Sequence, residues 1–368
     1  MNEIIVVGAG FAGSVCSRIL AEAGFRVLIV EKRDHVAGNA FDYLDADGIL
    51  VHKYGPHIFH TNSKRIFEYL SRFTDWRFYE HRVLALVDGK LYPIPINQTT
   101  ISRMYGTSPN EAAIESFFEK VRVPCDKITT SEDVVLSSVG YELCEKFFRG
   151  YTLKQWGLDL SELSAGVAAR IPTRVNDDDR YFTDSFQFMP SRGYTQLFQR
   201  MLDHPRIAIN LGTDYFERPH EMQCHHLIYT GPIDRFYDYR FGPLPYRSLR
   251  FEFQHFSDIE SFQPVAQINY PNDFEYTRIT EFKKLTGQVH DGTSIAREYS
   301  QPVGEPFYPI PTQSNEILFK RYQQLADNEH SVTFVGRLAQ YRYFNMDQAV
   351  AAAMLAAETV ITKFRKNK

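Results

Sequence analysis

The chain has 368 residues, 43% hydrophobic and 23% charged, which excludes a disordered or fibrous protein and leaves room for two or three domains. Its 41 Lys and Arg against 45 Asp and Glu give a net charge of −4, which argues against a general nucleic-acid binder. No stretch approaches ~20 uninterrupted apolar residues, and the chain runs directly into an apolar strand. We therefore expect no membrane span, no signal peptide and a cytoplasmic location.

Hydrophobic periodicity predicts the elements in chain order. Residues 4–7 read as a buried strand, residues 15–20 as a helix that stops at Gly24, and residues 27–30 as a second buried strand. Residues 111–149 and 160–170 carry helical periodicity, and residues 247–308 hold short alternating runs that predict antiparallel strands. Residues 332–335 predict another buried strand and residues 346–364 a helix. We expect the first and last segments to share one sheet.

A glycine fingerprint lies between the first strand and the first helix. Gly8 permits a tight turn, Gly10 lets the backbone approach a pyrophosphate, and Gly13 allows close helix packing. The helix N-terminus then offers free N–H groups to phosphates, while Glu31, after the second strand, can accept hydrogen bonds from a ribose diol. The spacing predicts a dinucleotide site, because a strand, the glycines, a helix, a second strand and an acidic residue follow one another in this order.

The cofactor class depends on the segment after Glu31. The chain continues into a polar turn at Gly38 and Asn39, which can wrap around a longer cofactor beyond its adenosine half. There is no second glycine fingerprint for NAD(P)H, and Gly336-Arg337 is typical of the late strand–glycine element that completes a flavin site. This arrangement resembles FAD-binding proteins of the glutathione-reductase and amine-oxidase type.

The predicted fold is therefore α/β, with an FAD-binding Rossmann-like domain, a helical insertion and an antiparallel β-sheet domain. The expected FAD-binding domain is discontinuous and comprises residues 1–80, 200–240 and 325–368. The mainly helical domain covers residues 98–172. The antiparallel sheet, or substrate domain, comprises residues 81–97, 173–199 and 241–324.

Five further segments occur in order along the chain: HKYGPHIFHT (52–61), GYTLKQWG (150–157), YTGPID (229–234), YTRITE (276–281) and FVGRL (334–338). Together they resemble the signature segments of the bacterial UDP-galactopyranose mutase family. The resemblance implies an isomerase that interconverts the pyranose and furanose forms of a nucleotide sugar, with no net redox change. It implies a covalent adduct between N5 of reduced FAD and the sugar, an electron donor that keeps FAD reduced, and a homodimer.

The fingerprint and the resemblance assign functional residues by motif position. Those expected to bind FAD are Gly8, Gly10, Ala12, Gly13, Glu31, Lys32, Gly38, Asn39, His57, Ile58, Gly336, Arg337, Asn345, Met346, Asp347 and Gln348. Those expected to bind substrate are His81, Phe147, Tyr151, Thr152, Trp156, Arg170, Tyr181, Asn269, Arg278, Tyr308 and Tyr343. Catalytic roles fall to Arg170, Arg278 and His60, with the two arginines clamping the leaving diphosphate.

Each of these residue types also has an ordinary structural interpretation. A single arginine is more often a solvated or ion-paired surface residue, and a single tyrosine more often packs in a core. The 14% aromatic content fits an aromatic core as well as an aromatic-walled cavity. His57 and His60 have metal-ligand spacing, but no third ligand accompanies them, and the four cysteines are too far apart for a thiolate site, so no metal is expected.

Several positions depart from the family pattern. Ala37 replaces the first glycine of the usual Gly-Gly-Asn turn, a change that is tolerated if this position does not require a positive φ. His81 stands where the family has asparagine, Phe282 where histidine is common, and Asn345 where an acid is usual. These departures are compatible with the mutase chemistry, but they leave the identity of the sugar undecided.

Alternative functions therefore remain. A related mutase would act on UDP-N-acetylgalactosamine or a dTDP-linked 6-deoxygalactose. A flavin oxidoreductase of the amine-oxidase type would consume an electron acceptor in each turnover and need no diphosphate clamp. A non-catalytic nucleotide-sugar-binding or flavin-binding protein would isomerise nothing under reducing conditions.

Overall fold

A five-stranded parallel sheet is built from both ends of the chain and its middle. The computed structural model describes residues 2–217 and 223–366. Ile4, Ile5 and Val6 are fully buried, because helices or loops cover both faces of the central strand. In spatial order the strands are β10 (Ile207–Asn210), β2 (Val27–Val30), β1 (Asn2–Val7), β11 (Cys224–Tyr229) and β17 (Val332–Phe334). The prediction that the first and last segments share one sheet is confirmed.

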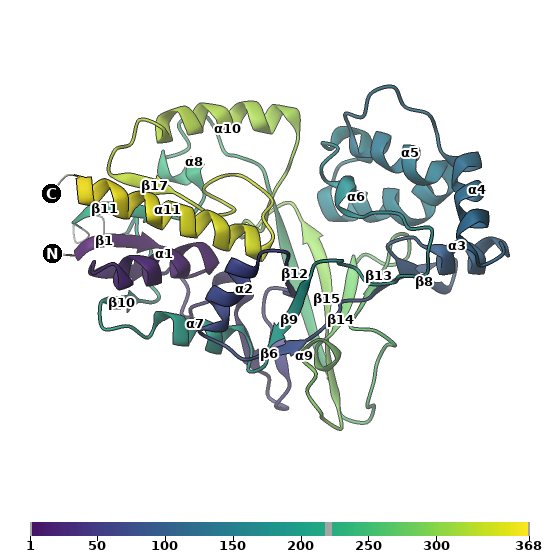
Figure 1. The fold of residues 1–368 in the computed structure, drawn as a ribbon, viewed down its shortest axis with the longest axis horizontal. Coiled ribbons are helices and arrows are strands. Elements are labelled where there is room, and N and C mark those ends of the chain that lie inside the picture. Colours follow the sequence, from purple (N-terminus) through teal and green to yellow (C-terminus); the bar gives the residue numbers. More distant parts are fainter. Residues whose placement is uncertain (1, 218–222, 367–368) are drawn as a thin grey trace.

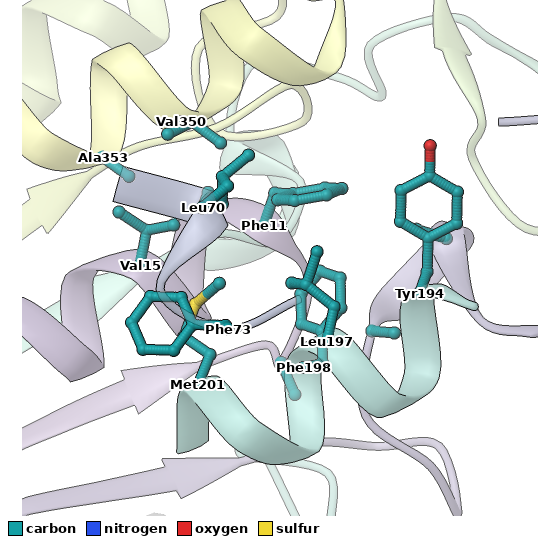
Figure 2. Packing of buried hydrophobic residues seen from close by; sticks show 14 of the residues in the cluster. Phe11, Val15, Leu70, Phe73, Tyr194, Leu197, Phe198, Met201, Val350 and Ala353 are labelled. Atoms are coloured by element: carbon teal, nitrogen blue, oxygen red, sulfur yellow. The ribbon is translucent and has the colours of Figure 1, made fainter. Parts of the chain in front are cut away.

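Four helices pack together beside this sheet. Phe11 and Val15 of α1 lie against Phe198 and Met201 of α7 and against Val350 of α11 (Figure 2). The ring of Phe11 meets the ring of Phe198 edge-on, with the centroids 4.7 Å apart. The elements are α1 (Phe11–Glu22), α2 (Lys64–Ser71), α7 (Tyr194–Leu202) and α11 (Met346–Lys366). The C-terminal helix thus completes the core begun by the N-terminal βαβ unit.

A second, seven-stranded sheet occupies the centre of the molecule (Figure 1). Its order is β16 (Tyr308–Pro309), β12 (Tyr246–Phe256), β15 (Thr293–Gln301), β14 (Arg278–Glu281), β13 (Gln267–Asn269), β7 (Val83–Val87) and β8 (Lys90–Ile94). The predicted antiparallel pairing is confirmed for β12–β15, β14–β15 and β13–β14. The sheet is mixed, however, because β13 runs parallel to β7.

Smaller elements connect the two sheets. A hairpin is formed by β3 (Asp42–Leu44) and β4 (Leu50–His52), and a three-stranded sheet by β5 (Phe59–Thr61), β9 (Phe186–Pro190) and β6 (Trp76–Phe78). Short helices are η1 (Gly38–Ala40), α8 (Ile233–Phe236) and α9 (Phe282–Thr286). The longer α10 (Gln313–Ala326) adds Tyr322 to a hydrophobic cluster with Ile233 and Leu244.

The helical insertion lies at the far side of the seven-stranded sheet from the parallel sheet (Figure 1). It comprises α3 (Gln98–Tyr105), α4 (Glu111–Val121), α5 (Ser131–Leu143), the π-helix η2 (Cys144–Arg149) and α6 (Gly150–Trp156). The prediction of a helix over residues 160–170 is wrong. The 3₁₀ turns η3 (Leu160–Glu162) and η4 (Ala168–Arg170) flank a segment whose backbone bonds go elsewhere, since the Ser164 N–H donates to the Pro311 carbonyl at 3.1 Å.

The described residues include no helix with the length and apolar content needed to span a membrane. The division into three domains stays a prediction. The parallel sheet and the seven-stranded sheet nevertheless separate clearly in Figure 1, with the insertion beyond the second.

Candidate functional site

A cavity of about 1020 Å³ opens at the carboxyl ends of β1, β2 and β11. This edge of a parallel sheet is where α/β folds bind nucleotides, because helix N-termini and loops meet there. Among the residues expected to bind a cofactor, the cavity is lined by Gly8, Gly10, Ala12, Glu31, Lys32, Gly38, Asn39, His57, Gly336, Arg337, Asn345 and Met346.

The fingerprint glycines serve different purposes. Gly8 has φ +100°, and a Cβ there would lie 2.2 Å from Thr230 Oγ1. A Cβ on Gly13 would lie 1.9 Å from the Gly8 carbonyl oxygen, so Gly13 keeps α1 close to the strand. A Cβ on Gly10 would meet only Gly38 Cα, at 3.8 Å. Gly10 therefore leaves open space rather than relieving a contact in the protein.

The N-terminus of α1 faces the cavity through Gly10, Phe11 and Ala12. The first turn contains no acidic residue, and the Gly10 N-cap has no side chain to occupy the free N–H groups. These donors and the positive end of the helix dipole suit an anion such as a pyrophosphate.

Glu31 is held at the end of β2 by two backbone donors. Its carboxylate accepts hydrogen bonds from the Ala9 N–H at 2.8 Å and from the Arg33 N–H at 2.9 Å. Only 6% of the residue is exposed. The carboxylate lines the cavity with a fixed orientation and further acceptor capacity, as recognition of a ribose diol requires.

The turn at Ala37 corrects the sequence interpretation. Ala37 has φ +75°, in the left-handed region, and its N–H donates to the Ala9 carbonyl at 2.9 Å. The condition for a harmless replacement of glycine is therefore not met, because an L-residue in this region is strained by about 1–2 kcal/mol. Gly38 follows with φ +55°, and a Cβ there would lie 2.9 Å from Gly10 Cα.

Four residues expected to bind the cofactor do not line the cavity. Gly13 packs α1 against β1, and Ile58 packs against the main hydrophobic core. Asp347 accepts a hydrogen bond from Thr61 Oγ1 at 3.0 Å. Gln348 accepts one from the backbone N–H of Asn345 at 2.9 Å. The last two contacts support the wall at Asn345 and the start of α11.

The sequence interpretation assigned no role to the loop at residues 302–307, which lines the cavity. Glu305 of this loop forms ion pairs with Lys32 at 2.9 Å and with Arg33 at 2.5 Å. The Arg33 guanidinium also lies 4.1 Å from the ring centroid of Tyr54. The two prolines and the glycine of this segment mark a loop, but no local pattern indicates which surface it covers.

An aromatic cluster lies where α6, β16 and the segment before α11 meet. The rings of Tyr308 and Tyr343 are stacked with centroids 5.2 Å apart, and Trp156 lies 6.3 Å and 6.1 Å from them. The Arg170 guanidinium lies 4.0 Å from the Tyr343 centroid and donates a hydrogen bond to Asn345 Oδ1. Five residues expected near the substrate or cofactor are thus in direct contact.

Arg278 lies deeper in the molecule, on β14 opposite Glu298 of β15. The two side chains form an ion pair at 2.9 Å, with 19% and 3% of them exposed. Burial alone would lower the pKa of Arg278, but Glu298 and neighbouring tyrosines hold it well above its usual value. Burial raises the pKa of Glu298 even though Arg278 opposes the shift.

Tyrosines expected at the substrate lie close enough to this guanidinium to interact with its charge. Burial raises the pKa of Tyr151 and Tyr181, and the Arg278 charge opposes both shifts. Both phenols therefore stay protonated at neutral pH and can donate hydrogen bonds. The Arg278 Nε has no partner within the described part of the chain, which leaves a buried donor for a ligand.

His60 and His81 flank a single ring. Phe182 stacks on His60 with centroids 3.6 Å apart and on His81 at 6.2 Å. His60 Nδ1 lies 2.9 Å from Asp184, whereas His81 Nδ1 lies 3.0 Å from the Tyr79 hydroxyl. Burial lowers the pKa of His81 to about 3, so this imidazole is neutral in the folded protein.

The remaining expected substrate residues occupy supporting positions. Asn269 lies directly opposite Arg278 in the β13–β14 register, and its side-chain oxygen accepts from Gln267 Nε2 at 2.9 Å. Phe147 and Thr152 are buried on η2 and α6. Phe282, one of the family departures, packs in the hydrophobic core against His52.

His57 and His60 do not belong to a group of three or more possible metal ligands in the part of the chain that the structure describes. Among the described residues, the group with suitable donors is Asp45, Asp47 and His255, whose ligand atoms lie within 4.8 Å of one another. Asp45 Oδ1 there accepts from the backbone N–H groups of Asp47 and Ile49, which accounts for its orientation as a turn cap.

The cavity and the aromatic cluster are contiguous. Asn345 and Arg337 both line the cavity. Asn345 accepts from Arg170, and the Arg337 guanidinium lies 5.2 Å and 5.5 Å from the centroids of Tyr308 and Tyr343. The arrangement can hold a dinucleotide beside a second anionic ligand and can stabilise negative charge that develops between the two.

Comparison with known proteins identifies the relatives of this chain. Residues 146–343 match the family model "UDP-galactopyranose mutase", and residues 6–73 match "NAD(P)-binding Rossmann-like domain". A probable UDP-galactopyranose mutase of Klebsiella pneumoniae is 41% identical over 98% of this chain and 95% of its own length. A dTDP-fucopyranose mutase of Escherichia coli is 37% identical over 98% and 99%. A crystal structure of reduced UDP-galactopyranose mutase superposes with a TM-score of 0.81 at 17% identity, covering 98% of this chain and 96% of the other. The predicted fold class is confirmed.

Proposed function

Because the chain belongs to the UDP-galactopyranose mutase family, we propose that it interconverts UDP-galactopyranose and UDP-galactofuranose with reduced FAD as cofactor. One observation supports the assignment most directly. Asn345 and Arg337 line the dinucleotide cavity and also contact the Arg170–Tyr343–Tyr308 cluster. Cofactor and anionic substrate would therefore meet at a shared wall.

The residues of the large cavity fit FAD. Its volume of about 1020 Å³ reaches the upper end of the ~300–1,000 Å³ range of small-molecule sites, as a dinucleotide requires. The N-terminus of α1 would hold the pyrophosphate, Gly10 and Gly38 would admit it to the backbone, and Glu31 would hold the ribose. When bound and reduced, FAD supplies a nucleophilic N5 that can carry the sugar covalently without net redox change.

The chain's own contribution is to stabilise the departing diphosphate. Negative charge on the leaving oxygen grows as the sugar–phosphate bond breaks, and fixed guanidinium groups of Arg170 and Arg278 favour that state over the ground state. Tyr151 and Tyr181 are protonated and lie near Arg278, so they would donate hydrogen bonds to the phosphates. The stacked rings of the aromatic cluster would keep water from the reacting carbon.

The direct test is turnover. The purified protein, reduced with dithionite, is incubated with UDP-galactofuranose, and UDP-galactopyranose is measured by chromatography. We expect isomerisation only under reducing conditions and no reductant consumed per turnover. Consumption of an electron acceptor would indicate the amine-oxidase type of chemistry instead. The absence of any isomerisation would indicate a non-catalytic binding protein.

A second candidate substrate is a dTDP-linked 6-deoxygalactose. The relative named dTDP-fucopyranose mutase is almost as similar as the Klebsiella protein, at 37% against 41% identity. His81 and Asn345 differ from the family pattern, and a neutral buried imidazole beside Tyr181 presents different hydrogen-bonding groups from an amide. Comparing kcat/KM for UDP-galactose, UDP-N-acetylgalactosamine and dTDP-fucose, in native protein and in His81→Asn, separates these substrates.

The assembly and the electron supply belong to the same proposal. We expect a cytoplasmic homodimer that accepts electrons from a separate reductant. Size-exclusion chromatography with light scattering tests the dimer, and a mass of 42.7 kDa in solution would identify a monomer.

A further inference from the structure

The loop at residues 302–307 links the two sheets of the molecule across the large cavity. It connects β15 to β16 in the seven-stranded sheet, whereas Lys32 and Arg33 follow β2 of the parallel sheet. Glu305 of the loop forms ion pairs with Lys32 at 2.9 Å and with Arg33 at 2.5 Å. All three residues line the cavity, as does Glu31. The Glu305 carboxylate therefore joins two walls of the cavity beside Glu31.

The polar attachment of this loop runs through Glu305. Within the described chain, the backbone of residues 302–306 forms no hydrogen bond with other backbone groups, and Pro302 and Pro306 have no N–H to donate. Backbone pairing resumes at Phe307, whose N–H donates to the Arg247 carbonyl at 2.9 Å. Val303 is 78% exposed. The loop thus depends on the Glu305 carboxylate for its position against the parallel sheet.

The cations that receive this carboxylate are themselves fixed. The Arg33 N–H donates to the Glu31 carboxylate at 2.9 Å, and its guanidinium lies 4.1 Å from the Tyr54 ring centroid. Only 15% of the Arg33 side chain is exposed, against 45% of Lys32. Partial burial acts to raise the pKa of Glu305, but hydrogen bonds and charges from Lys32 and Arg33 hold it below its usual value. Glu305 is therefore ionised at neutral pH.

We propose that Glu305 is a positioning residue for the cofactor, which holds the loop at residues 302–307 against Lys32 and Arg33 beside Glu31 and so slows the release of FAD. This inference rests on the proposed function, which supplies FAD as the cofactor. The ion pairs lie at the edge of the cavity where the ribose would bind, and FAD leaves past this edge only when they open. Their strength then sets the rate of FAD release.

The test is cofactor exchange, which requires no turnover. Holoprotein carrying unlabelled FAD is mixed with an excess of radiolabelled FAD, so that uptake of label is limited by release of the bound cofactor. The native protein is compared with Glu305→Gln, Lys32→Gln and the double variant. Glu358→Gln is the matched control, because Glu358 forms a partly exposed ion pair with Arg65 and does not line the cavity.

We expect Glu305→Gln to exchange FAD about three- to tenfold faster than the native protein, which is the scale for losing two partly exposed ion pairs. The double variant should be faster by less than the product of the two single effects, because both substitutions remove the same pair. Added NaCl should narrow the difference between Glu305→Gln and the native protein, because salt screens the ion pairs. Glu358→Gln should exchange as the native protein does.

An unchanged exchange rate in Glu305→Gln would overturn the proposal. A difference that NaCl leaves unaltered would also overturn it, because that result indicates a packing effect. These outcomes are independent of the isomerase assay. A holoprotein with the expected salt-dependent exchange that isomerises nothing contradicts the proposed function alone, whereas an active isomerase with unaltered exchange in Glu305→Gln contradicts only the role of Glu305.

Discussion

Replacing Glu298 by glutamine should destabilise the free protein and make its stability depend strongly on a bound diphosphate. Glu298 and Arg278 face each other across β14 and β15, and only 3% of the Glu298 side chain is exposed. Glu298→Gln keeps the size and a hydrogen-bond acceptor but leaves the Arg278 charge buried without its counter-ion. Removing one partner of a buried ion pair costs about 3–5 kcal/mol.

That cost converts to a measurable shift in melting temperature. The unfolding entropy of about 2.1 cal/mol/K per residue gives about 0.8 kcal/mol/K for a chain of 368 residues. We therefore expect Glu298→Gln to lower Tm by about 4–6 °C. UDP restores an anionic partner to Arg278, so saturating UDP should raise Tm more in the variant than in the native protein.

Differential scanning calorimetry with and without UDP measures both effects. Glu145→Gln is the control, because Glu145 pairs with Arg149 while 58% of its side chain is exposed, and such a pair contributes about 0–1 kcal/mol. A Tm for Glu298→Gln equal to that of the control, or a UDP-induced shift no larger than in the native protein, would refute the assignment of Glu298 as the counter-ion.

Three further predictions concern the cofactor, catalysis and acid stability. Gly10→Val should fold, because a Cβ there meets only one backbone atom, but the purified protein should be colourless because the side chain would occupy the space left for the pyrophosphate. Gly13→Ala should fail to fold, because its Cβ would lie 1.9 Å from a carbonyl oxygen. Flavin bound to Gly10→Val at the native content would contradict this prediction. Arg278→Ala should retain flavin and lower kcat about 10²-fold or more, which is the scale for losing one preorganised donor. If steady-state kinetics show an undiminished kcat, this arginine has no part in the mechanism. Burial lowers the pKa of His52 and His81 to about 3, against about 6.5 in the unfolded chain. Their effect on the free energy of unfolding is therefore constant above pH 6.5, and the folded protein loses stability as pH falls toward 3. At pH 5 the loss is about 2 kcal/mol for each histidine. Urea titrations should show His81→Asn to be less acid-sensitive than the native protein, and an identical pH dependence would contradict the neutral imidazole.

Local features of the sequence were sufficient to predict the nucleotide-binding half. A continuous apolar run at residues 4–7 requires burial on both faces, and Gly8 and Gly13 accept backbone conformations or approaches that a side chain forbids. These requirements act between residues close in the chain, so β1, α1 and β2 were predicted within a few residues of their observed bounds. Glu31 and the turn at Gly38 belong to the same unit and could be assigned with it.

The substrate side could be recognised by motif but not built from local pattern. The segment at residues 160–170 has helical periodicity, yet its backbone bonds to distant partners such as Pro311, which no local pattern encodes. The parallel pairing of β13 with β7 likewise joins strands far apart in the chain. At Ala37 the backbone adopts φ +75° because the surrounding turn requires it, against the preference of the residue itself.

The order of residues along the chain is enough to predict a dinucleotide site at the carboxyl edge of a parallel sheet and to name the arginines and tyrosines expected to bind a second ligand. The electrostatic state of those arginines depends on the three-dimensional fold. Arg278 meets Glu298 through the β14–β15 register, whereas Arg170 meets the amide of Asn345 across 175 positions of chain. The charge of a guanidinium is set by its residue type, but its neutralisation depends on which group long-range folding brings beside it.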